Sequence, residues 1–432
     1  MSSSTRPSTS WHSEMNLRTH TASRSRRNFL RHGLLGLGVP PGLACLLQRS
    51  ARALDAGAAG SGRSAGPERI LVVVELTGGN DGLNTIVPFR NDEYYRARPT
   101  LGIRRRDAIP VTGEAGFHPS LVGFERLYKD GKLAVVEGCG YPKPSLSHFS
   151  SMGFWHTGLP NGGEPLGWVG RLMDAHAAAD TPNAIVNIAS AQSLAVRGRV
   201  HSPIVFDDPE QLRRVGSAAE LRTLQRLDLH GESGNRSLDF LRATARNAAD
   251  SGALVRDAWD SYRTPVDYGI GGGLAADLRK VAALVAAGLP SRVYYVAYRG
   301  NSFDTHVHQA DLHSRLLMYT ADAVRGFCDD IERIGRGSDM AMMIFTEFGR
   351  RVEENGSQGT DHGTAGPMFV VGEAVRGGFY GEPPSLTDTD DGNLRMTVDF
   401  RRVYATMIAE WMGHANTRSV LKGDFPSLGV FS

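Results

Sequence analysis

One acid and two histidines lie within five residues of each other in the segment NSFDTHVH, residues 301–308. Asp304, His306 and His308 would share one face of an extended chain, and Asp304 and His308 would share a face of a helical turn. Imidazole nitrogen and carboxylate oxygen together suit Zn²⁺, Mn²⁺ or iron. Because the segment follows an apolar run at 293–298, it predicts half of a metal site at a strand end. The alternative is a polar loop with solvent-facing histidines.

A second acid follows another apolar run. Residues 70–76 are almost wholly aliphatic, and the next residues read TGGNDGLN, with Asn80 and Asp81 after two glycines. The glycines allow a sharp turn that would bring Asp81 to the sheet edge. The G-x-G-x-x-G dinucleotide fingerprint is absent, and an ordinary Asn-Asp-Gly turn is the alternative.

Serines and a histidine follow a third run, residues 133–136. Ser145, Ser147 and His148 lead into a segment of helical pattern that extends through Trp155. A serine at this point can cap the helix. The same position suits a nucleophile, because helix N-terminal amides stabilise a bound phosphate or sulfate and a nearby metal lowers the pKa of the hydroxyl.

The last group of polar residues follows the apolar run 340–346. Glu347 could ligate a cation, and Arg350 or Arg351 could pair with an oxyanion through the forked guanidinium. A surface salt bridge is the alternative for these residues. Asp361 and His362 stand between a glycine-rich approach and the apolar run 367–371, which predicts a functional imidazole at the rim of the sheet.

The order of these runs indicates the fold class. Apolar runs at 70–76, 133–136, 184–188, 293–298, 340–346 and 368–371 alternate with helical patterns, notably at 274–287 and 312–334. Such alternation predicts an α/β three-layer sandwich with a mostly parallel central sheet. The charged, alanine-rich stretch 207–267 is helical in pattern and is expected to be an insertion that covers one end of the sheet.

The N-terminus has the pattern of a twin-arginine (Tat) signal peptide. Residues 25–31 read SRRNFLR, an apolar segment covers 34–47, and Ala51-Arg52-Ala53 offers a cleavage site. The apolar segment is shorter than the roughly 20 residues of a membrane span. We expect a signal peptide at 1–53, a Gly/Ser/Ala linker at 54–67 and a mature domain from 68 to 432, with no stable membrane span. A weak lipoprotein-like site at Cys45 is a minor alternative.

The amino-acid composition narrows the class of protein further. The net charge of +2 includes the arginine-rich leader, so the mature protein is near neutral or acidic and nucleic acid is not an expected partner. Hydrophobic residues make up 41% of the chain, enough for a substantial core. Cys139 and Cys328 remain after removal of the leader and would permit one disulfide.

Five segments together resemble the DUF1501 family of exported bacterial proteins, and the similarity spans nearly all of the mature chain. They are GGNDGLN from Gly78, PSLSHF from Pro144, FDTHVHQ from Phe303, TEFGRRVEENGSQGTDHG from Thr346 and TVDFRRVYA from Thr397. That family in turn resembles the alkaline phosphatase and sulfatase superfamily. The resemblance implies an alkaline-phosphatase-like fold in which one or two metals hold a phosphate or sulfate ester against a nucleophile.

Carried over to this sequence, the resemblance implies two ligand sets. Asp81 and Glu347 would hold one ion together with the nucleophile, Ser147 first and Ser145 second; Asp304, His308 and His362, with Asp361 beside them, would hold the other. An oxygen-only site favours Mg²⁺, Ca²⁺ or Mn²⁺, and a histidine-bearing site favours Zn²⁺ or Mn²⁺. His148 is expected to act beside the nucleophile or as an outer-shell or substrate-facing group, with His306, Arg350 and Asn80 facing the substrate.

Two features depart from the superfamily pattern. Phe348 follows Glu347 where a histidine is common, so the second ion site loses an imidazole, and Cys139-Gly-Tyr-Pro-Lys lacks the C-x-P-x-R spacing of formylglycine sulfatases. The leading hypothesis is a periplasmic or extracellular metal-dependent hydrolase of small phosphate or sulfate-type esters, whose partner in export is the Tat machinery. The alternatives are a catalytically inactive metal-binding or assembly protein of the same fold, and a metal-free Ser/His/Asp hydrolase, which would lack the G-x-S-x-G elbow.

Overall fold

A mostly parallel sheet forms the centre of the computed structural model, which describes residues 69–179, 181–212, 235, 250–270 and 273–431. Its strands run in the order β11-β5-β10-β9-β1-β8-β6-β7, and β14 pairs with the end of β5. The bounds are β1 Ile70–Glu75, β5 Leu133–Gly140, β6 Ile185–Ile188, β7 Ile204–Phe206, β8 Val293–Ala297, β9 Met340–Phe345, β10 Gly366–Gly372, β11 Gly378–Tyr380 and β14 Val398–Asp399. All pairings are parallel except those of β10, which is antiparallel to β5 and β9.

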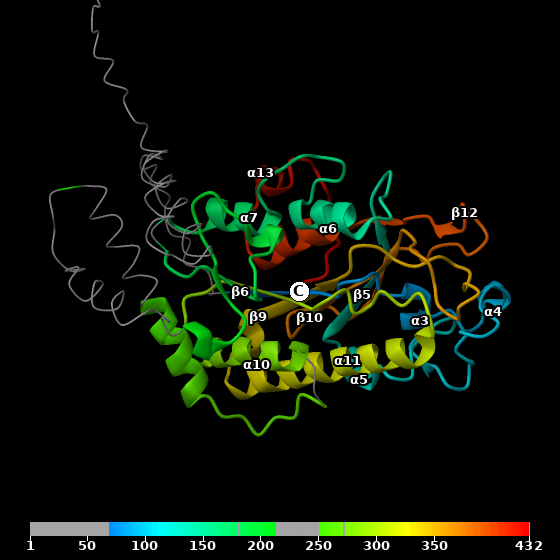
Figure 1. The fold of residues 1–432 in the computed structure, drawn as a ribbon, viewed down its shortest axis with the longest axis horizontal. Helices are drawn as coiled ribbons and strands as arrows, with labels where there is room; N and C mark the ends of the chain where they lie inside the picture. Colours follow the sequence, from blue (N-terminus) through cyan, green and yellow to red (C-terminus); the bar gives the residue numbers. More distant parts are fainter. Residues whose placement is uncertain (1–68, 180, 213–234, 236–249, 271–272, 432) are drawn as a thin grey trace, which may run out of the picture. The chain divides into compact units, whose positions relative to one another are not determined.

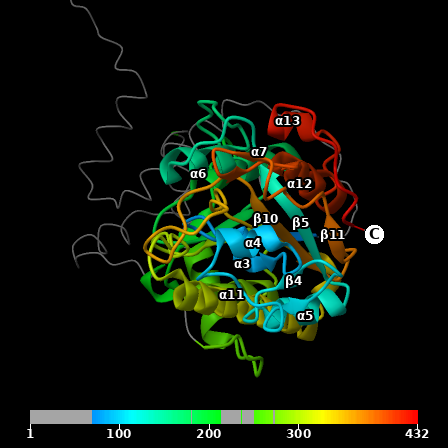
Figure 2. The same cartoon turned by 90° about the vertical axis from the view of Figure 1, so that its right-hand side faces the viewer.

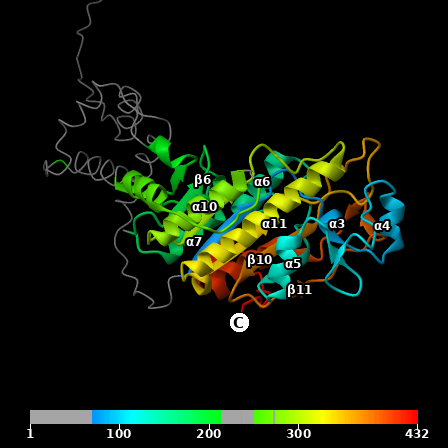
Figure 3. The ribbon, with the colours of Figure 1, turned by 90° about the horizontal axis from the view of Figure 1, so that it is seen from below.

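Helices cover both faces of this sheet (Figure 1). One face carries α5 Val122–Lys129, α10 Gly273–Ala286 and α11 Gln309–Arg333, and the other carries α6 His148–Thr157, α7 Trp168–His176, α12 Phe400–Thr406 and α13 Thr417–Leu421. Figure 2 shows β5, β10 and β11 between these two helical layers, and Figure 3 shows α10 and α11 side by side across one face. The predicted α/β three-layer arrangement is confirmed.

Shorter elements complete the described chain. They are α3 Gly82–Thr85, α4 Asp92–Ala97, the small sheet of β2 Ile86–Val87, β3 Ile109–Pro110 and β4 Gly116–Phe117, the pair β12 Thr389–Asp390 and β13 Asn393–Leu394, the 3₁₀ turns η2 Leu194–Val196, η3 Pro209–Leu212 and η4 Gly337–Asp339, and the π-helical turn η5 Met407–Trp411.

Strand β1 shows why the apolar runs predicted the sheet so well. Val72 and Val74 pack into the core beneath α10 and α11, whereas Leu71 and Val73 pack into the core beneath α6, α7 and α12. A strand buried on both faces needs apolar residues at every position, so it reads as a continuous run. Glu75, the polar end of the run, is buried too and accepts hydrogen bonds from the Tyr295 hydroxyl and the His156 ring.

The sequence also predicted how the chain is organised outside the central sheet. The predicted Tat signal peptide and the linker lie outside the described residues. Of the predicted insertion 207–267, residues 213–234 and 236–249 also lie outside them, and residues 250–261 are helical as expected. Within the described part of the chain, no helix is both long and apolar enough to cross a membrane. Cys139 and Cys328 are both free, so the disulfide that the sequence permitted is not formed.

The directions of the strands determine where the polar segments lie. Parallel strands β1, β8 and β9 end at one edge of the sheet, and the loops that leave them meet there. Because β10 runs in the opposite direction, the residues that precede it reach the same edge. The polar segments singled out in the sequence therefore converge at the carboxyl end of the sheet, where α/β proteins usually bind ligands.

Candidate metal centre

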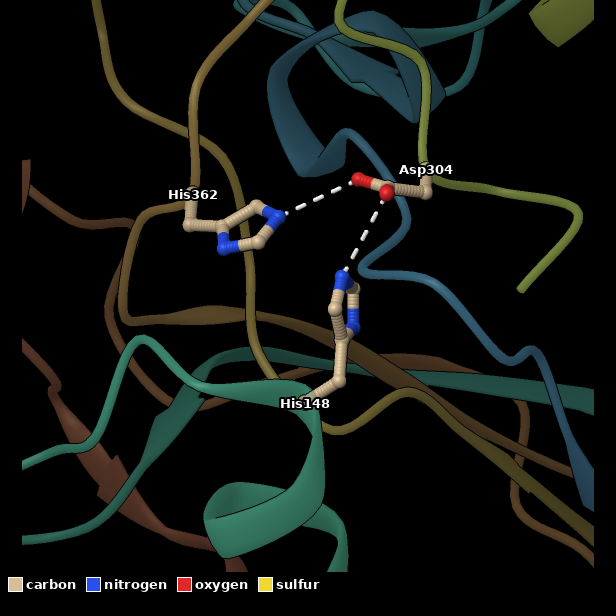
Figure 4. Close-up of side chains that lie close together, drawn as sticks. All are labelled: His148, Asp304 and His362. Atoms are coloured by element: carbon tan, nitrogen blue, oxygen red, sulfur yellow. Dashed lines mark hydrogen bonds and ion pairs between the residues drawn. The ribbon is translucent and has the colours of Figure 1, made fainter.

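His148, Asp304 and His362 form a cluster at this edge, drawn in Figure 4. Each offers one ligand atom, and the three atoms lie within 4.8 Å of one another. His362 Nε2 is 3.1 Å from one carboxylate oxygen of Asp304, and His148 Nε2 is 3.4 Å from the other. Two imidazoles and one carboxylate make a donor set typical of Zn²⁺ or Mn²⁺.

His148 is brought to the cluster by the start of α6. Its Nδ1 lies 2.7 Å from Glu347 Oε1, which fixes the ring and turns Nε2 toward Asp304. That hydrogen bond raises the pKa of His148 against the opposing effect of burial, with Asp304 adding to the rise. The carboxylate-to-histidine contact is the arrangement that orients many metal-bound imidazoles.

Asp304 follows β8 and is held from behind by Arg350. The guanidinium Nη2 donates to Asp304 Oδ1 over 2.8 Å, and hydrogen bonds from Arg350 and His362 lower the pKa of the acid to about 2 although burial opposes this. Arg350 itself is buried and also donates to the carbonyls of Gly78, Gly79, Phe303 and Thr360. The arginine predicted to face substrate is thus placed behind the acid, where it keeps Asp304 ionised.

His362 precedes β10 and closes the cluster. Its Nδ1 lies 2.7 Å from the carbonyl oxygen of Leu146, so Nε2 is directed at Asp304, and burial lowers the pKa of the ring. Phe348, the residue where the superfamily commonly has histidine, is buried, and its ring lies 4.9 Å from that of His148 and 4.6 Å from that of His362. It supplies an apolar wall for both imidazoles in place of a ligand.

His306 and Asp361 form an outer pair beside the cluster. His306 Nε2 lies 3.0 Å from Asp304 Oδ1 and 3.0 Å from His362 Nε2, while its Nδ1 lies 3.1 Å from Asp361 Oδ1. Asn355 donates to both Asp361 Oδ1 and the His306 carbonyl over 3.0 Å. Asp361, predicted as a ligand, therefore orients His306, and Asn355 ties the two loops together.

Glu347 is fully buried beneath the cluster. Its carboxylate accepts hydrogen bonds from the backbone amides of Gly78 and Gly79 and from the Thr346 hydroxyl, in addition to its contact with His148. Gly78 and Gly79 have positive φ angles of 114° and 80°, which explains why glycines fill this turn. Glu347 contacts the cluster through its hydrogen bond with His148 Nδ1.

Asp81, the other predicted oxygen ligand, lies in a separate buried network. Arg98 Nη1 and Gln309 Nε2 each lie 2.5 Å from Asp81 Oδ2, and the amide of Asn84 caps onto Oδ1 as α3 begins. Burial opposes ionisation, but Arg98 lowers the pKa of Asp81. Arg98 thus already balances the charge of Asp81, the acid that was expected to pair with Glu347 around a second ion.

His308 and Asn80 also lie away from the cluster. His308 adopts a left-handed conformation, φ 45°, at the N-cap of α11, and its side chain is exposed. The prediction assumed a regular strand or helix at 304–308, and the irregular turn there leaves His308 out of the cluster of His148, Asp304 and His362. Asn80 is buried and bonded to Thr85 and His313, so it does not face the cluster.

Ser147 stands at the N-cap of α6, but its side chain makes no capping hydrogen bond. The residue is exposed, and both neighbours contact the cluster: the Leu146 carbonyl accepts from His362, and His148 belongs to it. The predicted first nucleophile is therefore at the rim with its hydroxyl available. Ser145 Oγ instead accepts from the amide of Ser147 over 3.3 Å.

Several residues that hold the site together were not predicted from the sequence. Arg98, Gln309 and His313 build the network around Asp81, and Asn355 braces His306. Arg98, Gln309 and His313 are distant in the chain from the residues that they contact, as Asn355 is from His306, so no local spacing marked them. His148 was expected beside the nucleophile, whereas its geometry is that of a ligand.

One atom indicates that a cation fits this cluster. His148 Nε2 is buried and makes no hydrogen bond with any described residue, and its contact with Asp304 Oδ2 is an ion pair at 3.4 Å. Buried polar nitrogens are rarely left unpaired, and a bound ion is one of the standard explanations. The donor set and this nitrogen without a hydrogen bond agree, so His148, Asp304 and His362 would hold the ion.

Comparison with known proteins gave remote structural matches and one family. The C-terminal periplasmic domain of EcEptC from Escherichia coli, in complex with Zn, is 11% identical over 72% of this chain and 75% of that chain, with a TM-score of 0.35. The PsFucS1 sulfatase from Pseudoalteromonas sp. is 8% identical over 90% and 77%, with a TM-score of 0.37. A protein in the alkaline phosphatase superfamily from Vibrio parahaemolyticus is 12% identical over 78% and 70%, with a TM-score of 0.31. No activity is inferred from likenesses this remote.

The search of curated proteins found no match. A family model described as "Protein of unknown function (DUF1501)" matches residues 68–423, which cover every residue of the cluster. The chain belongs to the DUF1501 family.

Proposed function

We propose that this protein is an exported hydrolase of phosphate or sulfate esters that depends on one divalent cation and uses Ser147 as its nucleophile. The observation that carries the proposal is the convergence of His148 Nε2, His362 and Asp304 within 4.8 Å, with the buried His148 Nε2 in an ion-pair contact with Asp304 but without a hydrogen bond. A structural cluster of histidines would be expected to satisfy that nitrogen internally. An open coordination position between two imidazoles and an acid is typical of catalytic metal sites.

A single ion is favoured over the two that the resemblance implied. Asp81 is neutralised by Arg98, and Glu347 is occupied by two backbone amides, a hydroxyl and His148. Both acids thus have partners within the fold, which disfavours a second cation between them. Zn²⁺ and Mn²⁺ are the expected ions, because imidazole nitrogen with one carboxylate suits both.

The reaction follows from the position of Ser147. The bound cation would polarise an oxygen of the substrate and lower the pKa of a neighbouring hydroxyl. The Ser147 hydroxyl loses its proton to water, its oxygen bonds to the phosphorus or sulfur, and the ester bond breaks as the departing alkoxide takes up a proton. Water then cleaves the serine ester, which restores the hydroxyl and releases phosphate or sulfate.

The start of α6 supports the oxyanion in this scheme. No side chain caps the first turn of α6, so its N-terminal amides are available beside Ser147. Helix N-termini attract phosphate and sulfate because the amide donors and the helix dipole act together. Arg350 holds Asp304 in place without contacting the substrate.

The test is turnover of aryl phosphates, aryl sulfates and phosphodiesters by protein exported through its own pathway and loaded with Zn²⁺ or Mn²⁺. We expect Ser147→Ala and chelation each to abolish turnover, while Ser145→Ala, at the other candidate serine, retains it. Stoichiometric metal with no turnover of any ester would reject hydrolysis and favour the alternative, a metal-binding protein without catalysis. Retention of Zn²⁺ or Mn²⁺ by Ser147→Ala, measured by elemental analysis, is the control for folding.

A further inference from the structure

Three ligand atoms of the candidate site form a small triangle that includes His306. Its Nε2 lies 3.0 Å from His362 Nε2 and 3.0 Å from Asp304 Oδ1, and His362 Nε2 lies 3.1 Å from the same oxygen. Distances this short are those of hydrogen bonds, so each contact needs a proton or another positive charge between its two atoms.

The opposite nitrogen of each ring shows where the ring hydrogen lies. His362 Nδ1 is 2.7 Å from the Leu146 carbonyl oxygen, and His306 Nδ1 is 3.1 Å from Asp361 Oδ1. A carbonyl oxygen and an ionised carboxylate only accept hydrogen bonds, so both Nδ1 atoms carry the hydrogen. In the neutral rings, both Nε2 atoms therefore present lone pairs to Asp304.

A cation explains why these three acceptors lie together. Two lone pairs and an ionised carboxylate oxygen repel one another unless positive charge lies between them. Nitrogen ligands about 2.0–2.1 Å from a tetrahedral Zn²⁺ ion are roughly 3.3 Å apart, and the three contacts of 3.0–3.1 Å are close to that spacing. His148 has the same character, since its Nδ1 bonds to Glu347 and its Nε2 lies 3.4 Å from Asp304.

We propose that His306 is a fourth ligand of the cation, beside His148, His362 and Asp304, and that it is the ligand which a substrate oxygen displaces. This inference rests on the proposed function for its cation, but it does not require hydrolysis. Four protein ligands close a zinc site, so one of them has to leave before an ester oxygen can bind.

Exposure indicates which ligand leaves. The His306 side chain is 39% exposed, whereas those of His148 and His362 are each 21% exposed. His306 is also held by Asp361, whose side chain is 56% exposed, so the ring can turn aside while it keeps that hydrogen bond. The exchange replaces one nitrogen lone pair with one oxygen lone pair, and no proton moves.

The first measurement counts the imidazoles around Zn²⁺ by X-ray absorption at the zinc edge, in the full-length protein. We expect three in the wild type and in His308→Ala, and two in His306→Ala. His308 is the matched control because it is exposed and lies two residues further along the same loop. Two imidazoles in the wild type would overturn the fourth ligand, even if His306→Ala lost its metal.

The second measurement titrates inorganic phosphate into the Co²⁺-loaded protein and follows the visible spectrum. If phosphate has to displace His306, removal of the ring should strengthen phosphate binding, by about tenfold if the ring holds its position roughly nine-tenths of the time. His308→Ala should bind phosphate as the wild type does. Equal or weaker binding in His306→Ala would overturn displacement and assign the ring to direct contact with the anion.

The two measurements also separate this inference from the proposed function. Three imidazoles in the wild type and tighter phosphate binding in His306→Ala, without turnover of any ester, would retain the displaceable ligand and reject hydrolysis. Turnover of an ester by a wild type with only two imidazoles at the metal would retain hydrolysis and reject the fourth ligand.

Discussion

Asp81 and Asp304 follow neighbouring parallel strands, β1 and β8, yet their carboxylates end in opposite surroundings. The side chain of Asp81 is fully buried and paired with the equally buried Arg98. The side chain of Asp304 is 30% exposed and faces three imidazoles, those of His148, His306 and His362. The first acid contributes its charge to the fold, and the second keeps it available for a ligand.

The two acids differ in how an arginine contacts each carboxylate. Arg98 donates directly to the carboxylate of Asp81 and to the carbonyls of Arg351 and Val352, so it fills the space beside the acid. Arg350 donates to Oδ1 of Asp304, and the same carboxylate remains in contact with the rings of His148, His306 and His362. A buried ion pair of the first kind leaves no room for a cation.

Removal of Arg98 should have the largest effect. Arg98→Ala leaves a buried, uncompensated carboxylate at Asp81, which typically costs about 3–5 kcal/mol of unfolding free energy. Urea unfolding measures the loss, and Zn²⁺ affinity of the folded variant should stay close to that of the wild type. The exposed Arg104→Ala is the control and should shift stability by less than about 0.5 kcal/mol. A small loss in Arg98→Ala would mean that Asp81 does not need its arginine.

Removal of a ligand should affect the metal and spare the fold. His148→Ala is expected to weaken Zn²⁺ binding more than about 100-fold, beyond the 10–100-fold typical of outer-shell partners. Competition with a chromophoric chelator gives the affinity. His308→Ala is the matched control, because the sequence predicted His308 as a ligand, and an equal loss in that variant would contradict the site that we describe.

The brace between the two loops should matter less than a ligand. Asn355→Ala removes the donor that His306 and Asp361 share, so we expect Zn²⁺ affinity to fall about 10- to 100-fold. The visible spectrum of the Co²⁺-loaded protein should change as the imidazoles reorient. Ser357→Ala alters the same loop without removing that donor and should match the wild type. Unchanged affinity in Asn355→Ala would assign Asn355 to loop folding alone.

Lowering the pH should reveal the contribution of ionised Asp81 to the unfolding free energy. The pKa of Asp81 lies below its ordinary value of 3.8, so its stabilising contribution is complete above that value and is lost as pH falls through the folded-state pKa. Below pH about 4, the unfolding free energy of the metal-free protein should fall by up to about 1.4 kcal/mol per pH unit more steeply than that of Asp81→Asn. If the unfolding free energies of the wild type and Asp81→Asn fall in parallel with pH, the ionisation of Asp81 makes no contribution to stability.

Most of the sheet was predictable from the sequence, and part of the site was. Strands such as β1 and β9 are buried on both faces and read as apolar runs, and α11 was expected within three residues of its observed start. Asp304 and His362 were expected at the edge of the sheet because they adjoin such runs, and they lie together there. His308 does not join their cluster, because a left-handed residue breaks the spacing rule, and the partner of Asp81 is an arginine 17 residues away that no local pattern marks.

The central claim is that one cation binds between His148, Asp304 and His362. Anomalous scattering from a crystal of the Zn²⁺-loaded protein tests it most directly. The account predicts a single strong peak between the two Nε2 atoms and the carboxylate of Asp304. A peak between Asp81 and Glu347, or no peak at the His148 ring, would contradict it.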